Sequence, residues 1–274
     1  MLEGIGYTYA PRTAFSLRAL ESVSLTVAPG ELVLVLGATG SGKSTLLRLA
    51  AGLLGGFDGS ATVDGEPLTR KSARGCVGLL FQDPESQLFA ETVLADVAFG
   101  PRNMGSSADE AAAAARDALV RVGLPPAEYG ERSPFSLSGG EARRAAIAGV
   151  LAFGPRYLLL DEPTAGLDAP GRRAVSAVIS EARRDAGVVV VSHSSEEFMG
   201  AADRVLVLAG GRSAYEGPAA DLIENPAVFG SVGLVAPDVL RVQMLARSRG
   251  CDIGPLTLDP LVAADALARA LGSA

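Results

Sequence analysis

Hydrophobic residues along the chain fall in short runs separated by turn residues, a pattern typical of a mixed α/β domain. In the first 80 residues these runs predict strands, broken at positions such as Pro29, Gly30, Asp64 and Gly65. The expected strands are 20–27, 32–36, 61–63 and 77–81, and one helix interrupts them at 43–54.

The pattern becomes helical after about residue 84. Ser107 and Glu110 form a possible capping box ahead of an alanine-rich helix that reaches residue 122, and 139–152 predicts another helix. Strands and helices then alternate, which favours a parallel sheet covered by helices. The strands are expected at 157–161, 188–192 and 204–208, with a helix at 171–184.

The strand pattern stops at about residue 225. Two further helices are expected at 237–249 and 259–271. We therefore predict a main domain over 1–225, with a helical subdomain at about 84–150, and a C-terminal helical extension over 226–274.

Composition and charge exclude several classes of protein. The chain has 274 residues, 48% of them hydrophobic, but its apolar runs are far shorter than the roughly 18 residues that span a bilayer. No secretory signal is visible, so a cytoplasmic location is expected. Cys76 and Cys251 lack the spacing of a metal or redox pair and are expected to be reduced thiols. A net charge of -7 disfavours a nucleic-acid partner.

Residues 37–44, GATGSGKS, match the phosphate-binding pattern G-x-x-x-x-G-K-[ST] between an apolar strand and a helix. The glycines allow backbone N–H groups to point at phosphate oxygens, and the helix adds its positive dipole end. Lys43 is expected to contact the β- and γ-phosphates, and Ser44 to ligate magnesium. The predicted nucleotide-binding residues here are Gly37, Ala38, Thr39, Gly40, Ser41, Gly42, Lys43, Ser44 and Thr45.

Two acidic residues end the buried strand in YLLLDEP. Asp161 is expected to hold Mg²⁺, through water. Glu162 is expected to act as the general base or to orient the water that attacks the γ-phosphate. The phosphate loop upstream favours this reading over a solubilising surface pair.

The segment LSGGE at 137–141 resembles the signature motif of ABC ATPases, which normally reads LSGGQ. The resemblance implies a P-loop NTPase with a RecA-like core, an antiparallel β subdomain, a helical subdomain and a small C-terminal helical extension. It also implies that ATP and Mg²⁺ are bound, and that Ser138, Gly139, Gly140 and Glu141 face the ATP held by an opposite subunit. Glu141 departs from the usual glutamine, so its effect on nucleotide affinity stays open.

Other marks of the family follow in order along the chain. The resemblance places Gln82 at the magnesium ion and the attacking water, Asp168 in AGLD at the nucleotide, and His193 against the γ-phosphate. We therefore predict Glu162, His193 and Gln82 as catalytic residues. Tyr9 is expected to stack on adenine, with neighbouring Tyr7 as the alternative and core packing nearly as good an explanation.

The segment FQDPESQLFAETVLADVAFGPRNMG, residues 81–105, closely resembles the ATPases of energy-coupling-factor (ECF) transporters, which import vitamins and transition-metal ions. In that family a coupling helix of a membrane scaffold docks beside this segment. The candidate contacts are Leu88, Phe89, Val93 and Phe99, with burial in the helical subdomain as the alternative for each.

The resemblance implies an ATP-hydrolysing subunit at the cytoplasmic face of the cell membrane, bound peripherally. The implied partners are a second ABC ATPase, a transmembrane scaffold and a membrane-embedded substrate-binding subunit. A heterodimer of ATPases is favoured and a homodimer stays open. The alternatives are an ATPase of a conventional ABC transporter or a soluble ABC ATPase that acts on nucleic acid.

Overall fold

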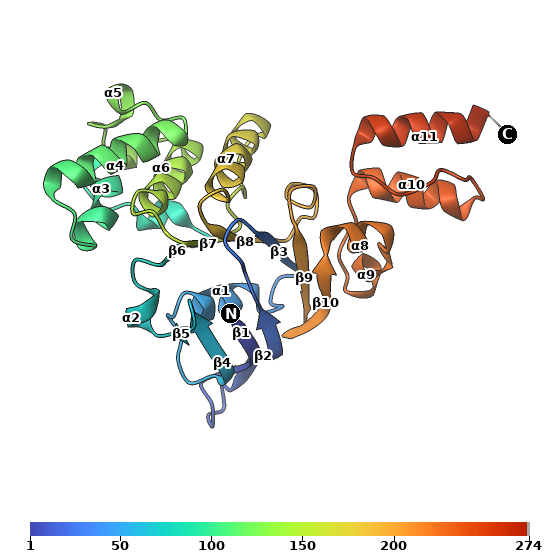
Figure 1. The fold of residues 1–274 in the computed structure, drawn as a ribbon, viewed down its shortest axis with the longest axis horizontal. Coiled ribbons are helices and arrows are strands. Elements are labelled where there is room, and N and C mark those ends of the chain that lie inside the picture. The colour runs from blue at the N-terminus through green and yellow to red at the C-terminus, as the bar shows by residue number, and fades with distance from the viewer. Residues whose placement is uncertain (273–274) are drawn as a thin grey trace.

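The computed structural model describes residues 1–272, and the last two residues of the predicted C-terminal extension lie outside this part. The fold combines two sheets with helices (Figure 1). The strands are β1 Leu2–Tyr9, β2 Leu17–Leu25, β3 Leu32–Gly37, β4 Asp58–Val63, β5 Glu66–Pro67, β6 Val77–Leu80, β7 Tyr157–Asp161, β8 Gly187–Ser192, β9 Arg204–Ala209 and β10 Arg212–Pro218.

The helices agree closely with the longer apolar patterns of the sequence. They are α1 Lys43–Ala50, α2 Arg70–Ala73, α3 Val93–Asn103, α4 Ala108–Arg121, α5 Pro126–Tyr129, α6 Gly139–Leu151, α7 Ala169–Ala182, α8 Ala219–Glu224, α9 Ala227–Ser231, α10 Asp238–Ser248 and α11 Pro260–Gly272, with short 3-10 turns η1 Pro84–Gln87 and η2 Pro134–Ser136. Ser107 and Glu110 form the expected capping box at α4. The expectation of one helix before residue 80 is wrong, because α2 is a second, short one.

The larger sheet has the order β10-β9-β3-β8-β7-β6. Strands β9, β3, β8, β7 and β6 are parallel, as the alternating pattern predicts, and β10 closes one edge as an antiparallel hairpin with β9. The hairpin loop consists of Gly210 and Gly211, both with positive φ, which suits a two-residue turn. Strands β3 and β8 are buried at every position, because helices or the second sheet cover both faces.

Alternate residues of β3 belong to different cores. Leu32, Leu34 and Leu36 pack into the cluster formed with helices α3 to α7, whereas Val33 and Val35 pack with α1 and the smaller sheet. The smaller sheet is antiparallel, with the order β2-β1-β4-β5. The predicted fold class is confirmed.

Three strands escape the sequence pattern, and one of them, β5, has only two residues. Strand β1 contains Gly4 and Gly6 and pairs with β2 through register shifts, so it lacks a clean alternation. Strand β10 is an edge strand with mostly polar residues, and only its partner β9 has an apolar run.

The structure separates the four apolar residues proposed for the membrane contact. Leu88 and Val93 are buried in the main core cluster, so their assignment to a partner contact is wrong. Phe89 and Phe99 are 59% and 46% exposed and meet edge to face with ring centroids 4.8 Å apart. These two remain candidates for the contact.

Helices α10 and α11 lie side by side at the far end of the molecule from α3–α5 (Figure 1). They pack around a small apolar cluster of their own, with Leu240, Ile253 and Leu256 at its centre. None of the helices among residues 1–272 combines the length and apolar character needed to cross a membrane.

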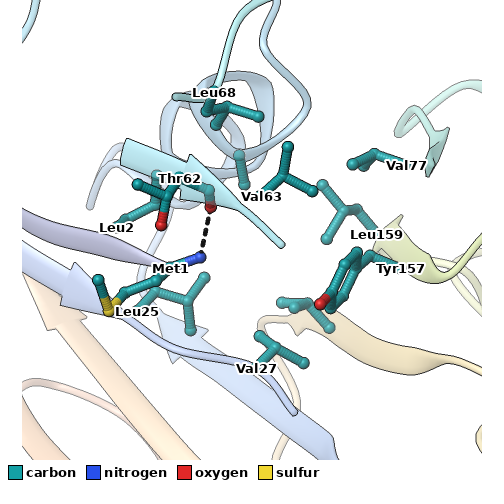
Figure 2. Close-up of a pocket in the computed structure, with 12 residues that line it drawn as sticks. Met1, Leu2, Leu25, Val27, Thr62, Val63, Leu68, Val77, Tyr157 and Leu159 are labelled. Atoms are coloured by element: carbon teal, nitrogen blue, oxygen red, sulfur yellow. Dashed lines mark hydrogen bonds between the residues drawn. The ribbon is translucent and has the colours of Figure 1, made fainter. Parts of the chain in front are cut away.

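A small apolar cavity of about 50 Å³ lies between the two sheets. Figure 2 shows Val27, Val63, Val77 and Leu159 around it.

Beside this cavity, the carboxylate of Asp64 in the β4–β5 turn ties the smaller sheet to the larger one. This carboxylate accepts hydrogen bonds from Arg156 Nη1 at 2.6 Å, Tyr157 OH at 2.9 Å and Cys76 Sγ at 3.4 Å.

We expect Asp64→Ala to lower the free energy of unfolding by about 1–2 kcal/mol, because these donors lose their common acceptor. Alanine is also strained at the φ of +52° that Asp64 adopts. Urea denaturation measures the change. Asp58→Ala, at an exposed position of the adjoining strand, is the control with an expected change below about 0.5 kcal/mol. Equal effects of the two substitutions would contradict the role of Asp64 as a tie.

Candidate functional site

The phosphate loop connects β3 to α1, and its conformation depends on glycine. Gly40 and Gly42 have φ values of +80° and +104°. A Cβ atom on Gly42 would lie 2.6 Å from the carbonyl oxygen of Ala19 and 2.7 Å from Cδ2 of Leu20. The close approach of β2 therefore allows only glycine at position 42.

Lys43 is buried within this loop. Its Nζ donates to the carbonyl oxygens of Gly37 at 2.6 Å and Ala38 at 3.0 Å. Burial lowers the pKa of Lys43, while the nearby carboxylates of Glu162 and Asp161 oppose this shift. The loop therefore holds the ammonium group of Lys43 where phosphate oxygens of a nucleotide can approach it.

Asp161 ends β7, and Glu162 follows it at the edge of the sheet. Burial raises the pKa of Asp161, although a hydrogen bond from Ser44 and the charge of Lys43 oppose the rise. Burial also raises the pKa of Glu162, against the effects of His193 and Lys43. Glu162 has a φ of +52°, a strained value for a residue other than glycine, and such strain is concentrated at functional sites.

His193 follows β8, the parallel neighbour of β7. Its Nδ1 lies 2.9 Å from Oε2 of Glu162, while the ring is largely exposed. With Glu162 ionised, Nδ1 carries the proton of this hydrogen bond and Nε2 is directed away from the carboxylate. The only histidine of the chain and the candidate base therefore form one unit.

A cavity of about 260 Å³ joins the phosphate loop to Asp161 and Glu162, whereas His193 does not line it. From the predicted set it is lined by Tyr9, Thr39, Gly40, Gly42, Lys43, Ser44, Thr45, Gln82, Asp161 and Glu162. Gly37, Ala38 and Ser41 belong to the same loop but do not line the cavity. Leu17, Arg18 and Ala19 of β2 also line it. No motif in the sequence marks these three residues.

The structure distinguishes the two candidate tyrosines. Tyr9 lines the cavity, and its hydroxyl lies 3.2 Å from Oγ1 of Thr45. Tyr7 packs edge to face against Tyr9 and joins the apolar cluster beneath the smaller sheet. The geometry favours Tyr9 for contact with the base.

The signature segment and Asp168 do not reach this cavity. Ser138 is the N-cap of α6, and Ser138 and Gly139 are exposed. Asp168 is the N-cap of α7, where Oδ1 accepts from the backbone N–H of Gly171 at 2.8 Å. A role for these residues at a nucleotide therefore requires a second subunit, as the resemblance implies.

Glu141 completes a capping box at the start of α6. Its carboxylate accepts from the backbone N–H of Ser138 at 2.8 Å and from the hydroxyl of Tyr129 at 3.1 Å. The hydrogen bond from the Ser138 backbone is the main cause of a lowered pKa of Glu141. A carboxylate suits this position because both of its neighbours are donors, whereas a glutamine amide offers one accepting oxygen.

The cavity and the parallel sheet define the class: a nucleotide-binding ATPase built around a phosphate loop. The family model described as "ABC transporter" matches residues 20–165. The energy-coupling factor transporter ATP-binding protein EcfA2 of Symbiobacterium thermophilum is 46% identical over 272 residues, covering 96% of this chain and 94% of the relative. The EcfA2 protein of Clostridium acetobutylicum is 41% identical and covers 92% and 91%.

Solved structures agree with these relatives. CbiO1 of Clostridium perfringens, described as part of the ABC transporter complex cbiONQ, has a TM-score of 0.73 and 31% identity, covering 89% of this chain and 97% of that one. The ATP-binding cassette MJ0796, a dimer bound to ADP and Pi, has a TM-score of 0.72 and 26% identity, with coverage of 80% and 97%. This chain belongs to the ABC transporter family of ATPases, among relatives that are ECF transporter ATP-binding proteins.

The raised pKa of Asp161 predicts a pH-dependent effect of Asp161→Asn on stability without nucleotide. Between the ordinary pKa of 3.8 and the raised one, the folded state binds more protons than the unfolded state. Stability therefore falls as the pH rises through this window. We expect Asp161→Asn to raise the free energy of unfolding at pH 7.5, with a gain that shrinks as the pH approaches the ordinary value.

Urea denaturation across this pH range measures the effect, and Asp117→Asn on the exposed face of α4 is the control. A loss of stability at pH 7.5, or a gain that does not change with pH, would contradict burial as the dominant influence on Asp161.

The capping role of Glu141 predicts that Glu141→Ala lowers the free energy of unfolding by about 1 kcal/mol. Glu141→Gln should lose less, because its amide oxygen can still accept from Ser138. Chemical denaturation compares these variants with Glu110→Ala, which removes the same type of capping box from α4. The loss at Glu141 should be the larger, since only Glu141 also binds a tyrosine hydroxyl. A larger loss at Glu110 would refute this reading.

Proposed function

We propose that this protein is the ATP-hydrolysing subunit of an ECF-type ABC importer, coupling ATP-driven dimer closure to uptake of a vitamin or transition-metal ion through separate membrane subunits. The observation that carries the proposal is the pairing of one cavity containing Lys43, Asp161 and Glu162 with a signature segment that lies outside it. Each chain thus supplies one part of a nucleotide site and needs the complementary part from another chain.

In the proposed reaction, Lys43 and the loop N–H groups bind the β- and γ-phosphates. Water attacks the γ-phosphorus, the bond to the ADP oxygen breaks, and Glu162 accepts or directs the proton of that water. The raised pKa of Glu162 makes it a stronger base than an exposed carboxylate. His193 holds the Glu162 side chain in place through the 2.9 Å contact.

The donor set also suits Mg²⁺, a hard cation that prefers oxygen ligands. Ser44, Asp161 and Gln82 all line the same cavity. These three residues would hold the ion, with Asp161 acting through water. When bound, Mg²⁺ would neutralise negative charge on the transferred phosphoryl group.

The proposed dimer pairs Ser138, Gly139, Gly140, Glu141 and Asp168 of one ATPase with the ATP of the other. The relatives include a cassette solved as a dimer with ADP and Pi, which supports this arrangement. The exposed apolar residues of α10 and α11 support a contact between ATPases in the C-terminal extension: Val242, Leu245, Leu261 and Val262. We favour a second, different ATPase as the partner, with a second copy of this chain as the alternative.

A hollow of about 360 Å³ supports docking of a membrane scaffold at the cytoplasmic face of the membrane. It lies where the end of α1, α2, β6 and the end of α3 meet. Its walls include exposed Leu53, Phe81 and Met104, together with Phe153 and Arg74. Exposed apolar side chains gathered in a concave surface are typical of a helix-binding groove. A third subunit, embedded in the membrane, would select the substrate.

A tagged pull-down from detergent-solubilised membranes of the native host, read by mass spectrometry, tests the assembly. Recovery of a paralogous ATPase, a membrane scaffold and a small membrane-embedded binding protein is the expected result. Recovery of a conventional permease pair would contradict the ECF assignment. Recovery of soluble nucleic-acid proteins would contradict the transport assignment itself.

Glu162→Gln should lower kcat for ATP hydrolysis in the assembled complex by about 10²–10⁴-fold, because the amide cannot accept a proton. ATP binding should persist, and the variant should accumulate as an ATP-dependent closed dimer. Phosphate release and size-exclusion chromatography with MgATP measure the two effects. Glu181→Gln, which alters a surface pair with Arg121, is the control. Undiminished hydrolysis by Glu162→Gln would refute the role of Glu162.

A further inference from the structure

Arg143 is a buried charged residue in the second turn of α6, the helix that begins at the signature segment. It is 5% exposed. A guanidinium so deep in a protein requires several hydrogen-bond partners, because its proton cannot be lost and its burial is costly. The partners of Arg143 lie in loops that carry the hydrolytic residues.

One arm of the guanidinium contacts the loop after β7. Nη1 donates to the carbonyl oxygen of Glu162 at 3.3 Å and also to the carbonyl oxygen of Ala165. The N–H of Glu162 donates in turn to the carbonyl oxygen of Val191 at 3.0 Å. The strained peptide of Glu162 is therefore held on one side by β8 and on the other by Arg143.

The other arm contacts the loop after β6. Nη2 donates to the carbonyl oxygen of Gln82 at 3.3 Å and lies 3.4 Å from Oε1 of Glu85. The side chain of Gln82 lines the nucleotide cavity, so Arg143 reaches the backbone of a second residue of the site. A single side chain thus joins α6 to both loops.

Stabilisation of the fold alone does not account for these contacts. The Nε atom of Arg143 is buried without a hydrogen-bond partner among the described residues, and Glu85 is 40% exposed. Replacing a buried charge by a well-packed apolar side chain often leaves a protein equally stable, or makes it more stable. A functional role explains why an incompletely satisfied guanidinium is placed here.

We propose that Arg143 is a positioning residue for ATP hydrolysis, which fixes the backbone of Glu162 and Gln82 relative to the signature helix. This role rests on the ATP hydrolysis of the proposed function. Glu162 can hold its left-handed conformation, and thus direct its carboxylate toward His193, only while its peptide is held on both sides. Since α6 begins at Ser138, the same contacts connect the segment that would face the partner's ATP to the hydrolytic loops of this subunit.

The role requires arginine. A planar guanidinium directs separate N–H groups toward Glu162 and Ala165 on one side and Gln82 on the other, whereas the ammonium of lysine is a single point with three donors. Lysine therefore retains the charge but cannot span both loops. It is a suitable substitution for testing geometry separately from charge.

Arg143→Lys should lower kcat for ATP hydrolysis by the assembled complex about tenfold or more, because a small misplacement of reacting groups has a large effect on rate. The Kd for MgATP should stay within about threefold of the original value, since Lys43 and the phosphate loop are unchanged. Rates are expressed per nucleotide-binding site, titrated with a fluorescent ATP analogue, so that unfolded protein is not counted. The double variant Glu162→Gln, Arg143→Lys should still form the ATP-dependent dimer.

Arg183→Lys is the matched control. Arg183 also bonds two backbone carbonyls, those of Gly30 and Ala201, and one carboxylate, that of Asp203, but away from the nucleotide cavity. It should lower thermal stability without a change in kcat per site. A kcat for Arg143→Lys within threefold of the original, an equal loss for Arg183→Lys, or failure of the double variant to dimerise would each overturn the positioning role. Absence of hydrolysis by the unmodified complex would instead refute the proposed function itself, and with it this role.

Discussion

The site depends on the parallel pairing of β3, β8 and β7. In a parallel sheet the carboxyl ends of neighbouring strands lie at one edge, so the residues that follow these strands are brought together whatever their separation in sequence. Here the pairing brings the phosphate loop after β3, Glu162 after β7 and His193 after β8 to one place. Strands β3 and β8 are buried at every position because both faces of the sheet are covered, and this burial fixes the position of the edge.

Burial of charge is the second constraint on this edge. Lys43, Asp161 and Glu162 each have a pKa shifted toward the neutral form by desolvation, and each is partly compensated by the opposite charges beside it. Such a cluster costs stability in the isolated protein. In the proposed function, a nucleotide and Mg²⁺ would add charges of both signs at this place, so their binding would recover part of that cost.

The helical subdomain does not line the nucleotide cavity. It contributes an exposed surface instead. Its helix α6 presents the signature segment outward, and Glu141 stabilises that end through a capping box instead of the glutamine common in the family. Deeper along the same helix, Arg143 reaches the loops of the site. One helix therefore exposes the signature segment at its start and contacts the loops of the cavity further along its length.

The sequence alone was sufficient for the parallel strands of the larger sheet, the phosphate loop, the acidic strand end and the signature, because each depends on local periodicity or on residues at fixed spacing. It also identified α4 from its capping box and both helices after Pro237. Only the tertiary structure decided which apolar residues of 81–105 are core, that Tyr9 rather than Tyr7 lines the cavity, and that Arg18 joins it. It alone revealed Arg143 as a contact of Glu162 and Gln82. These features depend on which surfaces meet when distant segments pack, and no local pattern of residue types encodes that contact.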